Sequence, residues 1–269
     1  MKRNFIIIIT LFFITSCASS PTGRNQLMLV SPEQAISSSK TAYVETLKPL
    51  DVEGKVDNHP ELTKRIKLIT GRLITQAIKQ YPFAKNWGWQ VKVIDDPKTI
   101  NAWCMAGGKM AIYTGLINEL NATNDEIAQV MGHEISHALA HHTAEQMSIA
   151  MATQVGIMGI GLAVKDSKYS SMALSGTALA ASLAIKLPNS RTAESEADRM
   201  GIEIAAKSGY NPNAAVTLWQ KMDKANKDKP PEFLSTHPNP ENRQATLKSL
   251  IPKMMKYYQQ KKEYPVYPL

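Results

Sequence analysis

The sequence is poor in cysteine, with only two among its 269 residues. This scarcity excludes a scaffold held by several disulfides and a zinc ribbon built on four cysteines. Arginine is scarce as well, because 24 of the 31 basic residues are lysine, scattered along the chain. Since proteins read phosphates and base edges mainly with arginine, we interpret the net charge of +8 as solvated surface and expect no nucleic-acid partner.

Apolar residues, in contrast, are present in globular proportion. Hydrophobic residues make up 43% of the chain and charged residues 20%, which excludes a chain that is disordered throughout. The length is sufficient for a large hydrophobic core. We predict a single domain over residues 31–269.

The chain begins with Lys2 and Arg3, which precede an apolar run from Phe5 to Ile14 that only Thr10 interrupts. This run is too short to cross a bilayer, which needs about 20 residues, but it has the length of a signal-peptide core. We therefore predict that residues 1–16 are a signal peptide.

The run ends in Ile14-Thr15-Ser16-Cys17, which resembles a bacterial lipobox. The resemblance implies that Cys17 is acylated and that residues 17–30 form a lipidated tether. An ordinary signal peptide followed by a chance cysteine is the alternative. Because Ala18 and Ser19 follow the cysteine in place of aspartate, similarity to known lipoproteins implies an outer-membrane lipoprotein of the bacterial cell envelope that faces the periplasm.

Apolar periodicity and capping signals predict an α+β fold that is predominantly helical. Two helix starts carry a capping box, formed by Ser31 with Gln34 and by Thr123 with Glu126. The expected elements are a helix from about residue 31, a helix over 60–79, strands over 87–94 and 107–113, a helix from Thr123 to about Glu145, and a helix from about Arg191.

Histidine is concentrated in one place, since four of the six histidines lie in the segment GHEISHALAHH at residues 132–142. His133 and His137 are four residues apart, so on a helix their imidazoles share one face and can bind a single metal ion. Glu134 lies beside that face, where it can take a proton from metal-activated water. The pattern predicts a catalytic zinc site on this helix.

A catalytic zinc needs a third protein ligand and an open position. His141 is one turn further along, but it lies about 12 Å from His133 along the helix axis, so the three histidines cannot converge. Metzincin spacing would require histidine where the chain has Thr143. Cys104 is chemically able, as in enzymes that deformylate peptides, but a secretory signal conflicts with that intracellular task.

The remaining candidate is the segment RTAESEADR at residues 191–199. Glu194 and Asp198 are four residues apart and share a helix face, whereas Glu196 points roughly to the other side. One of the two carboxylates could bind the zinc while the other accepts a hydrogen bond from a ligand histidine. A solvated acidic helix start is the alternative.

Together, GHEISHALAHH and ESEAD resemble the HtpX-like and CAAX-prenyl-protease-like family of zinc metalloendopeptidases (gluzincins), in its Oma-like periplasmic lipoprotein branch. The resemblance covers roughly residues 20–250. It also includes Thr22-Gly23-Arg24, the segment Asn101-Ala102-Trp103 with Gly107-Gly108, and His237-Pro238 with Pro240-Glu241-Asn242-Arg243.

This resemblance implies a metalloprotease domain with a small β-sheet, whose edge strand borders the active-site cleft. It also implies one Zn²⁺ per chain, with the ligands His133, His137 and Glu194, the general base Glu134, and Asp198 as the partner of a ligand.

Other residues are candidates for substrate contacts. His237, Arg243 and Tyr210 could stabilise the oxyanion, and His237 could instead occupy the open zinc position and keep the enzyme latent. The strand from Gly107 to Tyr113 is expected to pair with an extended substrate, with Gly107, Gly108, Lys109 and Met110 as the binding residues. An interior structural strand is the alternative.

Two stretches near the motif carry no charge, residues 146–164 and 169–185. They are long enough for membrane spans, but glycine, alanine, serine and threonine make their hydropathy weak. We expect residues 146–187 to form a helical lid or hairpin near the active site, with two membrane helices as the alternative.

These features predict an endopeptidase that hydrolyses misfolded or misassembled periplasmic and outer-membrane proteins. A chaperone-like or assembly-factor lipoprotein with a structural or vestigial zinc site is the alternative. Glu134 favours the enzyme, because a structural site has no use for a base beside an open metal position.

Overall fold

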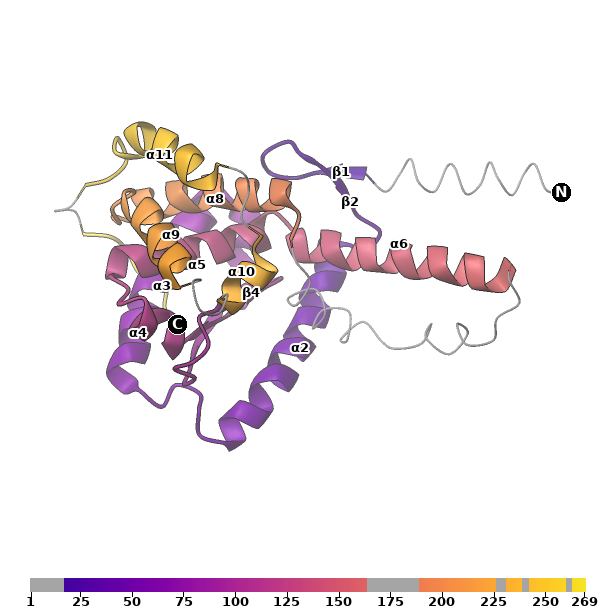
Figure 1. Cartoon of the computed structure of the whole chain (residues 1–269), viewed down its shortest axis with the longest axis horizontal. Helices are drawn as coiled ribbons and strands as arrows, with labels where there is room; N and C mark the ends of the chain where they lie inside the picture. Colours follow the sequence, from indigo (N-terminus) through magenta and orange to yellow (C-terminus); the bar gives the residue numbers. More distant parts are fainter. Residues whose placement is uncertain (1–16, 164–188, 226–230, 239–241, 260–262) are drawn as a thin grey trace.

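The computed structural model describes residues 17–163, 189–225, 231–238, 242–259 and 263–269 (Figure 1). Most of these residues are helical and the strands form two small sheets, in agreement with the predicted α+β class. The predicted signal peptide (residues 1–16) and the part of the predicted lid from residue 164 onward lie outside the described residues.

Two long helices begin where the sequence predicts. α2 (Pro32–Val52) starts at a capping box in which Ser31 and Gln34 bond reciprocally. α3 (Pro60–Gln80) buries a stripe of apolar side chains that includes Ile66 and Leu73. The short 3-10 helix η1 (Pro82–Asn86) leads from α3 into the larger sheet.

The larger sheet contains β3 (Gln90–Ile94), β4 (Ala102–Met105) and β5 (Lys109–Tyr113), in the order β3-β5-β4. β5 pairs in parallel with β3 and antiparallel with β4, so neighbours occupy both of its edges. The strand over 107–113, which is expected to pair with an extended substrate, therefore has no open edge in the described sheet. That strand is central, and β4 forms the edge.

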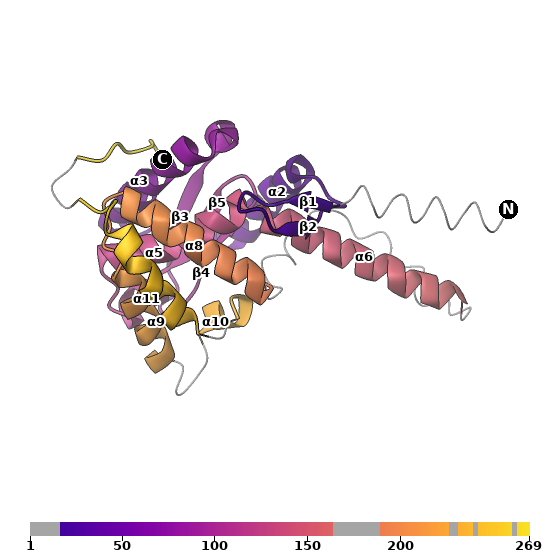
Figure 2. The same ribbon diagram turned by 90° about the horizontal axis from the view of Figure 1, so that it is seen from above.

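Two central helices approach each other backbone to backbone. After α4 (Thr114–Glu119), α5 (Asn124–Leu139) is buried along nearly all its length and packs against β4 and α8 (Arg191–Lys207) (Figure 2). A Cβ atom on Gly201 of α8 would lie 2.8 Å from the backbone nitrogen of His133. Glycine at this position therefore allows the close approach of α8 to the histidine motif.

The helix expected to run from Thr123 to about Glu145 ends earlier, at Leu139. His141 adopts a positive φ of 57°, and α6 (His142–Ala163) begins after it. In both views α6 projects from the body of the molecule (Figures 1 and 2). Within the described ranges, no helix combines the length and the apolar character needed to cross a membrane.

Residues 17–27, which belong to the predicted tether, form an antiparallel hairpin. Its strands are β1 (Cys17–Ser19) and β2 (Asn25–Leu27), and its turn includes Gly23 with a φ of +87°. The hairpin lies against the first turns of α6 and α8 (Figure 1). We call it the N-terminal hairpin.

The C-terminal elements close the core around α5 and α8. They are α9 (Ala214–Ala225), the short α10 (Glu232–Thr236) and α11 (Arg243–Met254). The backbone N–H of Phe233 donates to Ile100 O at 3.1 Å, so α10 lies beside the segment that precedes β4. The final segment returns to α3, where Tyr267 N–H donates to Gly71 O at 3.0 Å.

Candidate active site and metal centre

α5 places the histidine motif in the core of the molecule. His133, Glu134 and His137 are 5%, 2% and 4% exposed. The helix begins at the predicted capping box of Thr123 and Glu126. Because one helical turn separates the two histidines, they share a face, and their Nε2 atoms lie 3.0 Å apart.

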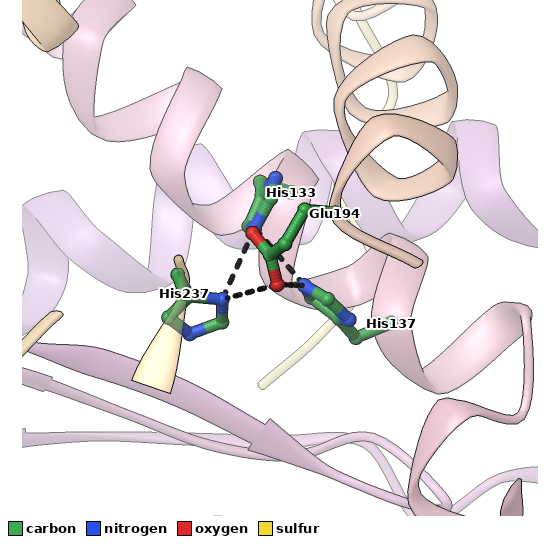
Figure 3. Close-up of side chains that lie close together, drawn as sticks. All are labelled: His133, His137, Glu194 and His237. Carbon is green, nitrogen blue, oxygen red and sulfur yellow. Dashed lines mark hydrogen bonds and ion pairs between the residues drawn. The ribbon is translucent and has the colours of Figure 1, made fainter. Parts of the chain in front are cut away.

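Glu194 of α8 and His237, which follows α10, complete a buried cluster of four potential ligands (Figure 3). Glu194 oxygens lie 3.2 Å from His133 Nε2 and 3.3 Å from His137 Nε2. His237 Nδ1 lies 3.3 Å from His133 Nε2 and 3.1 Å from Glu194 Oε1. The structure thus brings together residues from three helical segments that are far apart in the sequence.

The spacing of these atoms fits a tetrahedral metal ion. Ligand atoms at roughly 2.0–2.1 Å from such an ion lie about 3.3 Å from one another. Five of the six residue pairs approach to 3.0–3.3 Å, Glu194 with both of its oxygens, and one ligand atom from each residue lies within 4.8 Å of the others. Three imidazoles and one carboxylate are a donor set that suits a divalent ion such as zinc.

Asp198 and Arg243 support the ligands from behind. Asp198 Oδ1 lies 3.0 Å from His133 Nδ1. Arg243 Nε donates to Asp198 and Arg243 Nη2 donates to Glu194, each at 2.7 Å. The guanidinium also stacks 3.8 Å from the ring centre of Trp219. Arg243 is therefore engaged with two carboxylates, while its Nη1 has no hydrogen-bond partner among the described residues, and its role as an oxyanion donor stays a prediction.

The surroundings set the charges of the ligands. Burial lowers the pKa of His137 well below its ordinary value, which keeps this imidazole neutral and able to bind a metal. Burial alone would raise the pKa of Glu194, but three neighbouring histidines hold it well below its usual range. Burial opposes the protonation of His133, yet Glu194 and Asp198 raise its pKa to about 10, so a metal ion would displace a proton there.

Glu134 lies next to the ligand cluster. Its Oε1 atom is buried and has no hydrogen-bond partner among the described residues. This atom lies 3.4 Å from His237 Nε2. Burial raises the pKa of Glu134, against the opposing effect of His237 and His133. A carboxylate with a free oxygen and a raised pKa suits a general base.

His237 occupies the fourth corner of the cluster. Its ring stacks on Phe233 with a centroid distance of 4.2 Å, and its Nδ1 points to the other ligands (Figure 3). Of the two roles left open for His237, this geometry matches a fourth ligand better than an oxyanion donor. The other oxyanion candidate, Tyr210, is buried beside Arg72 of α3, outside the cluster.

The edge strand that borders the site is β4. A pocket of about 30 Å³ beside Glu134 is lined by Trp103 and Cys104 of this strand. The Cys104 thiol is buried, which raises its pKa well above the ordinary value and disfavours the thiolate that binds metals. The expected substrate residues lie elsewhere, with Gly107 and Gly108 in the β4–β5 turn and Lys109 and Met110 in the central strand.

One histidine at the site escapes sequence reasoning. On a continuous helix His142 would point away from His137, but the break at His141 places their Nδ1 atoms 2.7 Å apart. The available signal is the second histidine of the pair that ends GHEISHALAHH. The position of His142 could be predicted only if the left-handed conformation of His141 were known, and the identity of residue 141 as histidine does not predict that conformation.

A helix with two histidines and a glutamate, a carboxylate ligand from a second helix and a small mixed sheet define a metallopeptidase. The chain belongs to peptidase family M48, whose model matches residues 60–251. This is a family of peptidases, and the cluster of His133, His137 and Glu194 implies that the chain binds a divalent metal.

Named relatives extend this finding. The chain is 31% identical to the mitochondrial metalloendopeptidase OMA1 of Bos taurus, over 94% of this chain and 49% of that protein. It is 35% identical to the beta-barrel assembly-enhancing protease of Escherichia coli, over 70% of this chain and 38% of that protein. The corresponding protease of Yersinia pestis is 34% identical over 68% and 38%. The chain thus spans about half or less of the length of these relatives.

Proposed function

We propose that the protein is a zinc endopeptidase of the bacterial cell envelope that degrades misfolded or misassembled periplasmic and outer-membrane proteins. The free carboxylate oxygen of Glu134, beside four convergent ligands, is the observation that supports peptide hydrolysis most directly. We place the protein in the Oma-like branch of the HtpX-like family, with an outer-membrane lipid anchor at Cys17. The lipobox-like start and the similarity to two bacterial proteases named for β-barrel assembly support this placement.

In the proposed mechanism His133, His137 and Glu194 would hold the zinc, which when bound would activate a water molecule and polarise the peptide carbonyl. Glu134 takes the proton of the attacking water and then passes it to the leaving amine. His237 leaves the fourth corner so that a substrate can enter.

We further propose that β4, in place of β5, binds the substrate main chain. Asn101 and Tyr113 form a hydrogen-bonded pair, so by antiparallel alternation the main-chain groups of Ala102 and Cys104 point away from β5. At that edge the N–H of Cys104 bonds to Glu134 and the N–H of Ala102 to Asn101 Oδ1 at 2.9 Å, so the substrate would pair with the carbonyl groups of these two residues, beside the reacting groups. Main-chain pairing there would tolerate many sequences, as removal of unfolded proteins requires.

The test is hydrolysis of unfolded casein by the zinc-loaded full-length chain in detergent. Glu134→Gln should retain zinc and lose roughly 10²–10⁴-fold of the activity, because the general base is removed while the ligands remain. Glu203→Gln, a half-buried change on α8 in a pair with Lys207, is the matched control and should retain activity. A zinc-loaded wild type that cleaves no unfolded protein would contradict the proposal and favour the chaperone-like alternative.

A further inference from the structure

The side of His137 that faces away from the ligand cluster contacts another buried histidine. Since His137 Nε2 points to the other ligands, its Nδ1 is available for a second partner. That partner is His142, the first residue of α6, whose Nδ1 lies 2.7 Å away. His142 is only 2% exposed, and the left-handed turn at His141 places it there.

His142 also contacts a carboxylate with its other ring nitrogen. Its Nε2 lies 3.1 Å from Glu196 Oε2. Because a carboxylate can only accept, a neutral His142 would donate to Glu196 from Nε2 and would accept from His137 at Nδ1. This arrangement of protons leaves the lone pair of His137 on Nε2, which is the tautomer that binds a metal through the cluster.

The N-terminal hairpin holds Glu196. Arg24 Nε donates to Glu196 Oε2 at 2.7 Å, and the hydroxyls of Ser20 and Thr22 donate to Glu196 Oε1. Arg24 also forms a two-pronged ion pair with Glu145 of α6, at 2.7 and 2.6 Å. Glu196 is 4% exposed, so the hairpin supplies most of the polar contacts of a buried carboxylate.

The two ligand histidines are thus supported in parallel ways. Behind His133, the pair of Asp198 and Arg243 is in direct contact with the ligand. Behind His137, the pair of Glu196 and Arg24 acts through the imidazole of His142. We propose that Arg24, Glu196 and His142 are positioning residues for His137, so that metal affinity depends on the docked N-terminal hairpin. The inference rests on the proposed zinc site, and the hairpin concerned begins at the predicted lipidation residue Cys17.

Zinc affinity of the full-length chain in detergent, measured by competition with a chromophoric chelator, tests this inference. Glu196→Gln preserves the shape of the side chain and should weaken zinc binding 10- to 100-fold, the usual effect of losing such a partner. Arg24→Gln should weaken it about tenfold or less, because Glu196 remains. Both variants should change the visible absorption of the Co²⁺-substituted site, which reports ligand geometry.

The controls separate positioning from stability. Glu203→Gln lies on the same helix and should bind zinc as the wild type does. Thr22→Val removes one hydrogen bond from Glu196 at an exposed residue, so it should fold normally and lower the affinity two- to threefold. Wild-type affinity and an unchanged Co²⁺ spectrum in both Glu196→Gln and Arg24→Gln would overturn the inference, and so would an equal loss in Glu203→Gln.

The readout also separates this inference from the proposed function. If the wild type binds zinc but cleaves no protein, the proposed function fails while the affinity comparison still decides the role of the hairpin. If Glu196→Gln and Arg24→Gln both keep the zinc affinity and the Co²⁺ spectrum of an active wild type, the role of the hairpin fails and the proposed function stands.

Discussion

The ligands of the candidate site are held in different ways, and His237 differs most from the others. His133 and Glu194 contact Asp198 and Arg243, which are buried and charged. His237 follows the five-residue helix α10 and rests on an aromatic ring. Its Nε2 also faces Glu134 Oε1, but at 3.4 Å, which is longer than the contacts of Asp198 with His133 and of Arg243 with Glu194. His237 is therefore easier to displace than these two ligands, which suits a side chain that must leave the metal for a substrate.

His237→Ala should therefore increase hydrolysis of unfolded casein several-fold, because it frees the fourth corner for the substrate. It should also lower zinc affinity about tenfold, since one ligand is lost. Steady-state kinetics and chelator competition on the same preparation provide both values. If kcat falls while zinc affinity is unchanged, His237 acts on the oxyanion instead.

At the scale of elements, the site depends on how closely α5 and α8 approach. Gly201→Ala would place a methyl group within 2.8–2.9 Å of backbone atoms of Gly132 and His133, and backbone cannot move aside as a side chain can. We expect a loss of about 1–3 kcal/mol in the free energy of unfolding, together with weaker zinc binding as Glu194 shifts from the histidines.

Urea unfolding and chelator competition measure both effects. Gly88→Ala is the matched control, because its added methyl group would meet only the flexible end of Lys109, at 3.1 Å. Equal stability of the two variants would show that the helices adapt without cost.

The start of α5 carries a pH-dependent contribution to stability. Burial alone would raise the pKa of Glu126, but hydrogen bonds from Lys221, the Thr123 backbone and Thr217 outweigh it and lower the pKa. Because the folded pKa lies below the unfolded value of about 4.3, the contribution is complete above that value and is lost as pH falls through the folded pKa.

Glu126→Gln should consequently lower the free energy of unfolding by about 1–2 kcal/mol at pH 7 and by clearly less at pH 3.5. Urea titrations at the two pH values measure the difference. A loss that is the same at both would show that shape, and not charge, is responsible.

The helix starts and the paired motifs could be predicted because their signals are local. The capping boxes at Ser31 and Thr123 each depend on two residues that are three apart. The two paired motifs, His133 with His137 and Glu194 with Asp198, depend on residues that are one helical turn apart. The order of the strands could not be predicted, because pairing of β5 on both sides depends on distant segments. The position of His142 also stayed hidden, since a single left-handed residue redirects the chain.

At the scale of the whole molecule, the buried cluster links metal binding to folding. Removal of zinc would leave four polar groups buried side by side without the positive ion that binds them all. These groups are His133, His137, Glu194 and His237. A ligand at 1,000 times its Kd stabilises the folded state by about 4 kcal/mol. For a chain of this size we expect a chelator to lower Tm by roughly 10 °C.

Thermal unfolding with and without chelator measures this shift. His133→Ala should melt at the same temperature in both conditions, because it cannot form the site. An unchanged Tm of the wild type after verified zinc removal would contradict the link.

Because α5 and α8 meet through their backbones at Gly132 and Gly201, packing holds the two halves of the metal site together independently of the covalent connection between them. A single peptide-bond cut within residues 164–188 would leave His133 and Glu194 facing each other. For the proposed endopeptidase, whose molecules could cut one another, this arrangement would allow the site to survive a single cleavage. A nicked molecule would run as two fragments in a denaturing gel and as one particle in gel filtration.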